Sequence, residues 1–206
     1  MLPLVDYRKI QYDAATGTVT VTLPEGMEID LGSVAKGYAG QLAAQMLREH
    51  GVQSALLNLG GNVQTVGTKP DGSPWQIGIK DPQGEDAMMV LSVEDQAVVT
   101  SGGYERYFEQ DGQTYWHIMD PSTGHPADSG LISVTIVGDE GVVCDGLSTA
   151  LFVMGLEKAA DLWAQSGDFE AVFVTASGEV YITEGLRDHF ALTERYADTP
   201  VSVIER

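Results

Sequence analysis

The feature that most constrains the fold of this chain is a succession of short segments in which polar and apolar residues alternate, separated by glycine-containing turns. Alternation with a period of two is typical of half-buried β-strands, and tight turns between such segments favour antiparallel pairing. Two stretches carry the wider spacing of a helix. The sequence therefore predicts an α+β fold, a single domain over residues 1–206 with a largely antiparallel sheet and a few helices, rather than a doubly wound sheet.

Several expected elements have distinct ends. One helix begins within residues 29–39 and stops before Gly51, and a second opens at Asp145 on an apolar run through Met154. We expect 54–59 to be a buried strand, 88–93 and 97–100 to pair through an acidic turn, and 171–175 and 180–183 to form a hairpin. The remaining expected strands cover residues 18–23, 62–66, 75–79 and 131–137.

The charge of the chain limits its partners. It carries 30 acidic against 11 basic residues, a formal net charge of −19 at pH 7. A nucleic-acid binder needs a basic face, so nucleic acid is excluded as a partner, and anionic membranes are unfavourable for the same reason. An anionic substrate would require local compensation by a metal ion, a lysine or the start of a helix.

Cysteine and hydropathy add two exclusions. A single Cys144 forms no internal disulfide or multi-cysteine metal site, and its apolar neighbours indicate a buried residue without a redox role. No signal peptide opens the printed sequence, and no run of 18 apolar residues predicts a membrane span.

Asp145 and Thr149 lie one helical turn apart on the same face, so a carboxylate and a hydroxyl are expected to converge at the start of the second helix. Oxygen donors of this kind suit Mg²⁺, which takes few protein carboxylates. The alternative is structural: Asp145 is a favourable N-cap, and Thr149 bonds back to the carbonyl four residues earlier. The residues alone leave both interpretations open.

The start of the first helix is a candidate phosphate site. Gly32 and Gly37 let backbone approach a ligand, free N–H groups occur in the first turn, and Lys36 adds a positive charge there. The order of glycine and lysine differs from a Walker A loop. A helix start with a solvated lysine is the alternative.

Three further segments are candidate ligand contacts. Asn58, Gly60 and Gly61 form either a close-approach segment or a glycine-rich hairpin. The segment of Thr100, Ser101, Gly102 and Tyr104 either cups a ligand or forms a turn with core tyrosines. His117 and Asp120 frame a turn, where the histidine is either an acid, base or phosphate contact or a structural residue.

The same segments carry a resemblance to a known family. The stretches Ile29–Ala39, Asn58–Asn62, Thr100–Gly102, His117–Gly124 and Asp145–Ala150 occur in the order and spacing of FAD:protein FMN transferases, the ApbE or thiamine-biosynthesis lipoprotein family. The resemblance spans roughly residues 5–190. It implies a Mg²⁺-dependent enzyme that uses FAD as substrate, transfers FMN to a Ser or Thr hydroxyl in a motif of an acceptor protein, and releases AMP.

The resemblance also implies roles for individual residues. Asp145 and Thr149 resemble the metal ligands, helped by backbone carbonyls near Ser148 and Ser33. Lys36 resembles the lysine beside the phosphates. The resemblance further implies that His117, with Asp120 beside it, activates the acceptor hydroxyl. It implies contacts to FAD by Ser33, Asn58, Gly60, Gly61, Thr100, Ser101, Gly102, Tyr104 and His117.

Two departures from the family pattern are visible. Family members usually carry a further N-terminal part with a lipoprotein signal, so the chain resembles an N-terminally truncated member, and an extracytoplasmic location follows from the resemblance alone. Asn62 stands where the family often has Asp.

Alternative functions follow from other classes. An FAD pyrophosphatase that yields FMN and AMP and a non-catalytic FAD- or AMP-binding fragment both fit the same motifs. A flavin carrier does not, because the segment from Asp145 resembles the acceptor motif but has Leu151 where the acceptor hydroxyl belongs.

Overall fold

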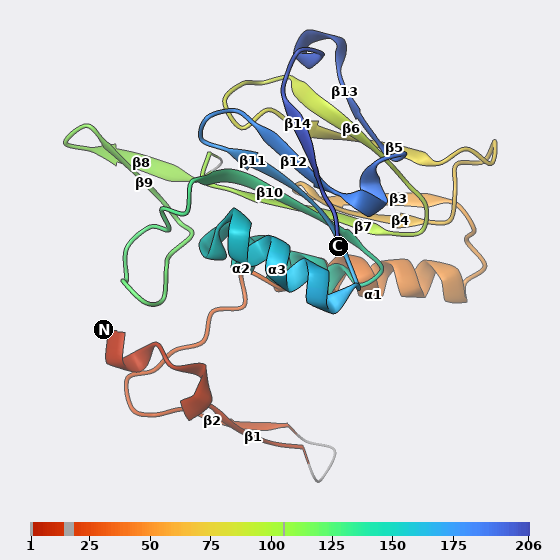
Figure 1. Cartoon of the computed structure of the whole chain (residues 1–206). Helices are drawn as coiled ribbons and strands as arrows, with labels where there is room; N and C mark the ends of the chain where they lie inside the picture. Colours follow the sequence, from red (N-terminus) through yellow and green to blue (C-terminus); the bar gives the residue numbers. More distant parts are fainter. Residues whose placement is uncertain (1, 15–18, 105) are drawn as a thin grey trace.

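The computed structural model describes residues 2–14, 19–104 and 106–206 and has three layers (Figure 1). Helices cover one face of a seven-stranded sheet, and a three-stranded sheet packs on the other face. Two two-stranded ribbons extend from this body. One belongs to the N-terminal arm, and the other lies between the third and fourth strands of the large sheet in chain order. The layers confirm the predicted α+β class.

The elements have the following bounds. The α-helices are α1 (Ala35–Glu49), α2 (Gly141–Met154) and α3 (Leu156–Ser166), and short 3-10 helices cover Leu2–Leu4, Tyr7–Lys9, Glu184–Leu186 and Glu194–Tyr196. The strands are β1 (Gln11–Asp13), β2 (Thr20–Thr22), β3 (Ala55–Leu59), β4 (Asn62–Val66), β5 (Trp75–Lys80), β6 (Ala87–Val93), β7 (Ala97–Gly102), β8 (Tyr107–Gln110), β9 (Gln113–Trp116), β10 (Leu131–Gly138), β11 (Glu170–Thr175), β12 (Val180–Thr183), β13 (Phe190–Leu192) and β14 (Val201–Ile204). Residue 18, part of the expected first strand, lies outside the described residues.

The large sheet has the order β14-β12-β11-β10-β7-β4-β3. Its neighbours are antiparallel except for β12 and β14, which confirms the predicted largely antiparallel sheet. The prediction that 54–59 is a buried strand is wrong, because β3 is the edge strand, and Leu56 and Leu59 are exposed. An apolar run does not by itself distinguish a central strand from an edge strand.

The predicted pairing of 88–93 with 97–100 is also wrong. β6 pairs with β5 and β13 in the small sheet, whereas β7 pairs with β4 and β10 in the large one. The acidic turn between them carries the chain from one sheet to the other, with Asp95 at a φ of 56° and Gln96 bonded to Thr65 of β4.

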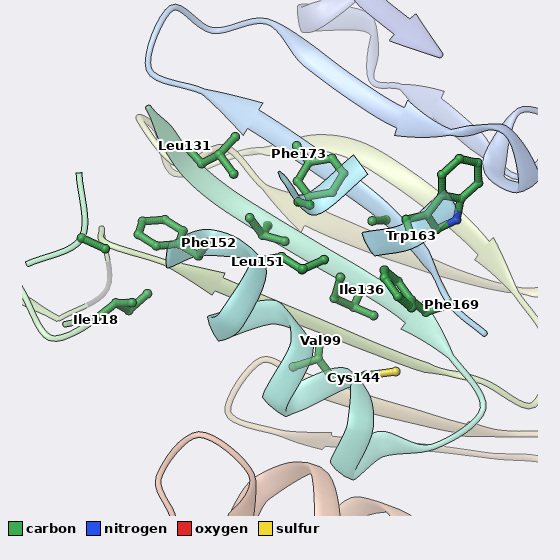
Figure 2. Packing of buried hydrophobic residues seen from close by; sticks show 14 of the residues in the cluster. Val99, Ile118, Leu131, Ile136, Cys144, Leu151, Phe152, Trp163, Phe169 and Phe173 are labelled. Atoms are coloured by element: carbon green, nitrogen blue, oxygen red, sulfur yellow. The ribbon is translucent and has the colours of Figure 1, made fainter. Parts of the chain in front are cut away.

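The core consists of two apolar clusters on opposite faces of the large sheet. One lies between the sheet and α2 and α3, where Phe152, Trp163 and Phe173 are fully buried (Figure 2). The other lies between the two sheets and is rich in Val, Ile and Met. The large sheet is therefore apolar on both faces, and alternate residues of each strand point to different clusters.

The helices agree only in part with prediction. α1 ends as expected, with His50 as C-cap and Gly51 at a φ of 82°. α2 begins at Gly141 rather than Asp145, and α3, which the sequence analysis did not predict, follows directly after Gly155. Gly155 at a φ of 81° separates α2 and α3, and α3 buries Ala159 and Trp163.

The inner face of α1 consists of small residues. Gly37, Gly40 and Ala44 are buried, while the apolar Tyr38 and Met46 are more than half exposed. Small residues on the inner face let α1 approach its neighbours closely, so the buried side of this helix is the reverse of what its apolar pattern predicts. In the described part of the chain, no helix is long and apolar enough to cross a membrane.

Candidate functional site

Asp145 lies in the second turn of α2, on the side that faces α1. Its side chain is 5% exposed, and its Oδ2 accepts a hydrogen bond of 2.8 Å from the backbone N–H of Gly37. The N-cap of α2 is Glu140, which makes no side-chain capping bond, so the interpretation of Asp145 as the cap of its own helix is wrong. The carboxylate instead binds the first turn of the other helix, where amides have no intrahelical acceptor.

Three hydroxyl groups form a connected cluster next to Asp145. Ser101 Oγ, from β7, lies 2.8 Å from Ser148 Oγ and 3.1 Å from Thr149 Oγ1. Ser148, not Thr149, donates back to the carbonyl of Asp145, at 2.9 Å. The predicted back-bond of Thr149 is therefore replaced by a contact with the sheet. This leaves the Thr149 hydroxyl one helical turn from the carboxylate, as the sequence predicted, although not at the start of α2.

The charge balance at Asp145 combines opposing effects. Burial raises the pKa of this carboxyl above its ordinary value, and the Gly37 N–H, the positive charge of Lys36 and the amide of Asn62 act in the opposite direction. Lys36 itself is exposed in the first turn of α1. Buried carboxylates whose negative charge is only partly compensated by protein groups are common at functional sites, because a ligand supplies the remaining compensation.

The start of α1 is held against α2. Val34, the N-cap residue of α1, lies 3.5 Å from the position that a Cβ on Gly146 would occupy. Ser33 is exposed and directly precedes Val34, and its contact to the cation and to FAD stays a prediction. Lys36, Asp145, Ser148, Thr149 and Ser101 converge at one place.

The donor chemistry of this place fits Mg²⁺. It offers one carboxylate, hydroxyls and backbone carbonyls, which are hard oxygen ligands. Within the described residues, no group of three or more His, Cys, Asp or Glu side chains could hold a metal ion. The site therefore suits a cation that completes its coordination with water and substrate oxygens rather than one that needs a full set of protein ligands.

A buried amide completes the neighbourhood of Asp145. Asn62, the first residue of β4, is 2% exposed, and its Nδ2 has no hydrogen-bond partner of acceptable geometry in the described structure. A buried N–H donor without a well-formed hydrogen bond can be satisfied by a bound group. The sequence analysis noted Asn62 only as a departure from the family pattern; its burial depends on strand pairing that composition does not reveal.

Asn58, Gly60 and Gly61 form a hairpin turn. Asn58 Oδ1 accepts from the Gly61 N–H at 2.8 Å, and both glycines have positive φ, 62° and 87°. A Cβ at either glycine would meet nothing within 4 Å, so the turn requires these glycines and no described part of the chain approaches them closely. Their contact to FAD stays a prediction. The hairpin alternative holds in the structure.

The segment after Val99 divides between two faces of the sheet. Ser101 points to α2, whereas Thr100 points to the other face and bonds Thr135 Oγ1 at 2.8 Å. The side chains of Thr100 and Ser101 therefore do not share one site, because adjacent strand residues point in opposite directions. The contact of Thr100 to FAD stays a prediction.

Gly102 and Tyr104 lie at the far end of β7. The Tyr104 ring covers Gly102 so closely that a Cβ there would be 2.2 Å from Cε1. Tyr104 also lines a surface pocket of about 460 Å³, together with Trp116 and Phe152. This pocket and the Asp145 centre are separate places in the described structure, and an elongated ligand such as a dinucleotide would have to extend to reach from one toward the other.

His117 and Asp120 lie beyond the β8–β9 ribbon. His117 is exposed, and its Nδ1 lies 3.3 Å from the carbonyl of Arg106. Asp120 accepts bonds from the N–H and hydroxyl of Ser122, which lower its pKa, with the hydroxyl as the larger cause. Both are therefore held by local contacts, and Asp120 uses its Oδ1 within its own turn. Its role beside His117 stays a prediction.

Together, these observations define an α+β protein with an oxygen-donor centre where the start of one helix meets the second turn of another. The model of the ApbE family matches residues 1–173. The chain belongs to the ApbE family.

Named relatives and solved structures agree with this family. The FAD:protein FMN transferase of Klebsiella pneumoniae is 40% identical over 192 residues, covering 92% of this chain and 58% of the relative. That of Treponema pallidum is 38% identical, covering 89% and 54%. The crystal structure of the ApbE protein of Thermotoga maritima superposes with a TM-score of 0.81 at 37% identity, covering 89% of this chain and 60% of that one. The chain thus spans little more than half the length of these relatives.

Proposed function

We propose that this chain carries the site for Mg²⁺-dependent transfer of FMN from FAD to a Ser or Thr hydroxyl of an acceptor protein, with release of AMP. The observation that carries the proposal is the buried Asp145, whose Oδ2 is bonded to the start of α1 beside the linked hydroxyls of Ser101, Ser148 and Thr149. The relatives named FAD:protein FMN transferase support the substrate and reaction class.

Asp145 and Thr149, with backbone carbonyls near Ser148 and Ser33, would hold the Mg²⁺. When bound, the ion would neutralise charge on the diphosphate of FAD, which so acidic a chain otherwise repels. The protein's own share is to hold the carboxylate and the hydroxyls in place through the bonds to Gly37 and Ser101.

Lys36 and the first turn of α1 would bind the phosphates. Lys36 is exposed beside Asp145, and the amides of a helix start attract anions. Phosphoryl transfer depends mainly on charge stabilisation and alignment, and a lysine beside a helix start supplies positive charge and N–H donors for the phosphates.

His117 would accept the proton of the acceptor hydroxyl. The hydroxyl oxygen forms a bond to the phosphorus that bears riboflavin, the anhydride bond from that phosphorus to the bridging oxygen breaks, and AMP leaves with the bridging oxygen. The exposure of His117 is consistent with a residue that must meet a protein substrate.

The test uses the chain with FAD, Mg²⁺ and a peptide bearing the acceptor motif. We expect AMP release and a peptide that carries covalent flavin, visible by fluorescence after denaturing electrophoresis. AMP and free FMN without labelled peptide would replace transfer with the pyrophosphatase reaction. Absence of both products with native FAD binding would contradict catalysis by this chain.

A second candidate is a non-catalytic FAD- or AMP-binding fragment. It is favoured by one observation, that the chain covers only 54% to 60% of its named relatives. The same assay, repeated with a full-length relative in parallel, separates the candidates, since only a binding fragment would retain FAD without releasing AMP while the relative turns over.

A further inference from the structure

α1 and α2 touch backbone to backbone at two glycines. A Cβ on Gly37 would lie 2.1 Å from the carbonyl oxygen of Gly141 and 2.7 Å from Asp145 Cβ. A Cβ on Gly141 would lie 2.7 Å from the carbonyl oxygen of Gly37. Distances under 3 Å do not occur for real Cβ atoms, so any other residue at either position would force the two helices apart.

This close crossing brings one particular amide to Asp145. Gly37 is the third residue of α1, and its N–H donates to Asp145 Oδ2 at 2.8 Å in a buried environment, across 108 positions of sequence. A carboxylate anchored by one oxygen cannot rotate freely about its terminal bond. Oδ1 is thereby presented in a fixed direction, and Oδ2 is occupied.

We propose that Gly37 is the positioning residue for Asp145: its missing side chain sets the distance between α1 and α2, and its N–H orients the carboxylate for the cation. This inference rests on the proposed role of Asp145. It changes the interpretation of Gly37, which the sequence suggested as a point of approach for a ligand; the backbone approaches α2 instead.

The neighbouring amide explains why the anchor is needed. Asn62 is 2% exposed and lies against the same carboxylate, where its amide lowers the pKa of Asp145 although Nδ2 makes no hydrogen bond of good geometry in the described structure. Rotation of the carboxylate toward this amide would turn its oxygens away from the cation. The bond from Gly37 opposes that rotation, because moving Oδ2 away would leave a buried backbone N–H unpaired.

Gly37→Ala tests the proposal, and Gly40→Ala is its matched control. Gly40 lies one turn further along the same face of α1, is also buried, and an added Cβ there meets only ordinary contacts, the nearest being Gln64 Cβ at 3.6 Å. Mn²⁺ is titrated into each variant with FAD present, and the free ion is followed by its electron paramagnetic resonance signal. We expect Mn²⁺ affinity to fall about tenfold or more in Gly37→Ala and to stay unchanged in Gly40→Ala.

A second variant separates orientation from packing. Replacing Gly37 by glycolic acid turns the amide into an ester, which removes the N–H without adding an atom that could clash. We expect this variant to remain folded, with a metal-free unfolding temperature lowered only by the loss of one buried hydrogen bond, while its Mn²⁺ affinity falls about tenfold. This variant also decides the question if Gly37→Ala does not fold.

The outcomes distinguish the inference from the function on which it rests. Tight Mn²⁺ binding by the ester variant, equal to the unsubstituted chain, would overturn the positioning role and leave the proposed function intact. If the Asp145→Ala variant binds Mn²⁺ as tightly as the unsubstituted chain does, the proposed metal site itself is contradicted.

Discussion

The Asp145 centre and the His117 turn are built in different ways. Asp145 is buried and bonded to a residue 108 positions away, and its neighbouring hydroxyls bond across to β7. His117 is exposed, and its Nδ1 lies 3.3 Å from the carbonyl of Arg106, which stands opposite it at the same end of the β8–β9 ribbon. The cation half of the proposed site is thus fixed by tertiary contacts, whereas the acceptor half depends on local turns.

This difference indicates what fixes the geometry of the cation half and of the acceptor half of the proposed site. A centre held by several distant elements keeps its geometry without substrate, and substitutions there should affect metal binding. A group held by one turn gains its final position when substrate is bound, and substitutions there should affect the transfer step. Four predictions test this division.

The largest effect is expected at Asp145. Asp145→Ala should reduce AMP release by more than the roughly 10–100-fold that loss of a supporting partner costs, because it removes the only carboxylate of the centre. It should also lower the free energy of unfolding by about 1–2 kcal/mol, since the Gly37 N–H becomes unpaired. Chemical denaturation and AMP assays measure the two effects.

Asp145→Asn is the matched control for that variant. Its amide oxygen still accepts from Gly37, so we expect stability close to that of the unsubstituted chain but an equally severe loss of activity. If Asp145→Ala loses stability but keeps its activity, the carboxylate serves only to cap the start of α1 and is no metal ligand.

The next effect is expected at His117. His117→Ala should slow transfer by about 10²–10⁴-fold while the affinity for FAD is unchanged, as expected for a general base. His125→Ala, an exposed histidine in the same loop, is the control and should leave the rate unchanged. Single-turnover labelling and FAD titration measure the two quantities, and an unaltered labelling rate would remove His117 from the mechanism.

A smaller effect is expected at the hydroxyl cluster. Ser101→Ala should weaken Mg²⁺ binding by about tenfold, because the Thr149 hydroxyl loses its partner on β7. Thr100→Val alters the adjacent residue on the opposite face and should leave Mg²⁺ binding unchanged, at a stability cost of about 1 kcal/mol for its bond to Thr135. Calorimetric titration in the presence of FAD compares them, and equal losses would contradict the assignment of faces.

The smallest effect is expected at Cys144. This thiol is 1% exposed, and burial raises its pKa to about 12, so it should remain protonated and unreactive towards a disulfide reagent at pH 8. Under the same conditions a histidine reagent should modify the exposed His117. Rapid labelling of Cys144 in the folded protein would show that the apolar cluster between α2 and the large sheet opens readily.

The sequence predicted those parts of the fold that local chemistry determines. The end of α1 at Gly51 and the hairpin between β11 and β12 follow from turn residues that act on their own neighbours. The start of α2 does not: Gly141 and Val142 are weak helix formers, and they are helical because Gly141 is needed at the crossing with Gly37.

The candidate site shows the same limit. Asp145, Thr149 and Lys36 could be selected by residue type and helical spacing, and the structure brings them together. Thr100 could not be separated from Ser101, because which face a strand residue occupies depends on the register with β10. The burial of Asn62 could not be predicted from the sequence either, since it follows from β4 lying between β3 and β7.

The path of residues 184–206 has a mechanical consequence. After β12 the chain leaves the large sheet, adds β13 to the small sheet beside β6, and returns as β14 alongside β12. The segment after β12 therefore connects the two sheets covalently. Its last element, β14, is mostly exposed. A force pulling on Arg206 would first break the contact of its guanidinium with the Trp163 ring and peel β14 from β12, and only then load the junction between the sheets.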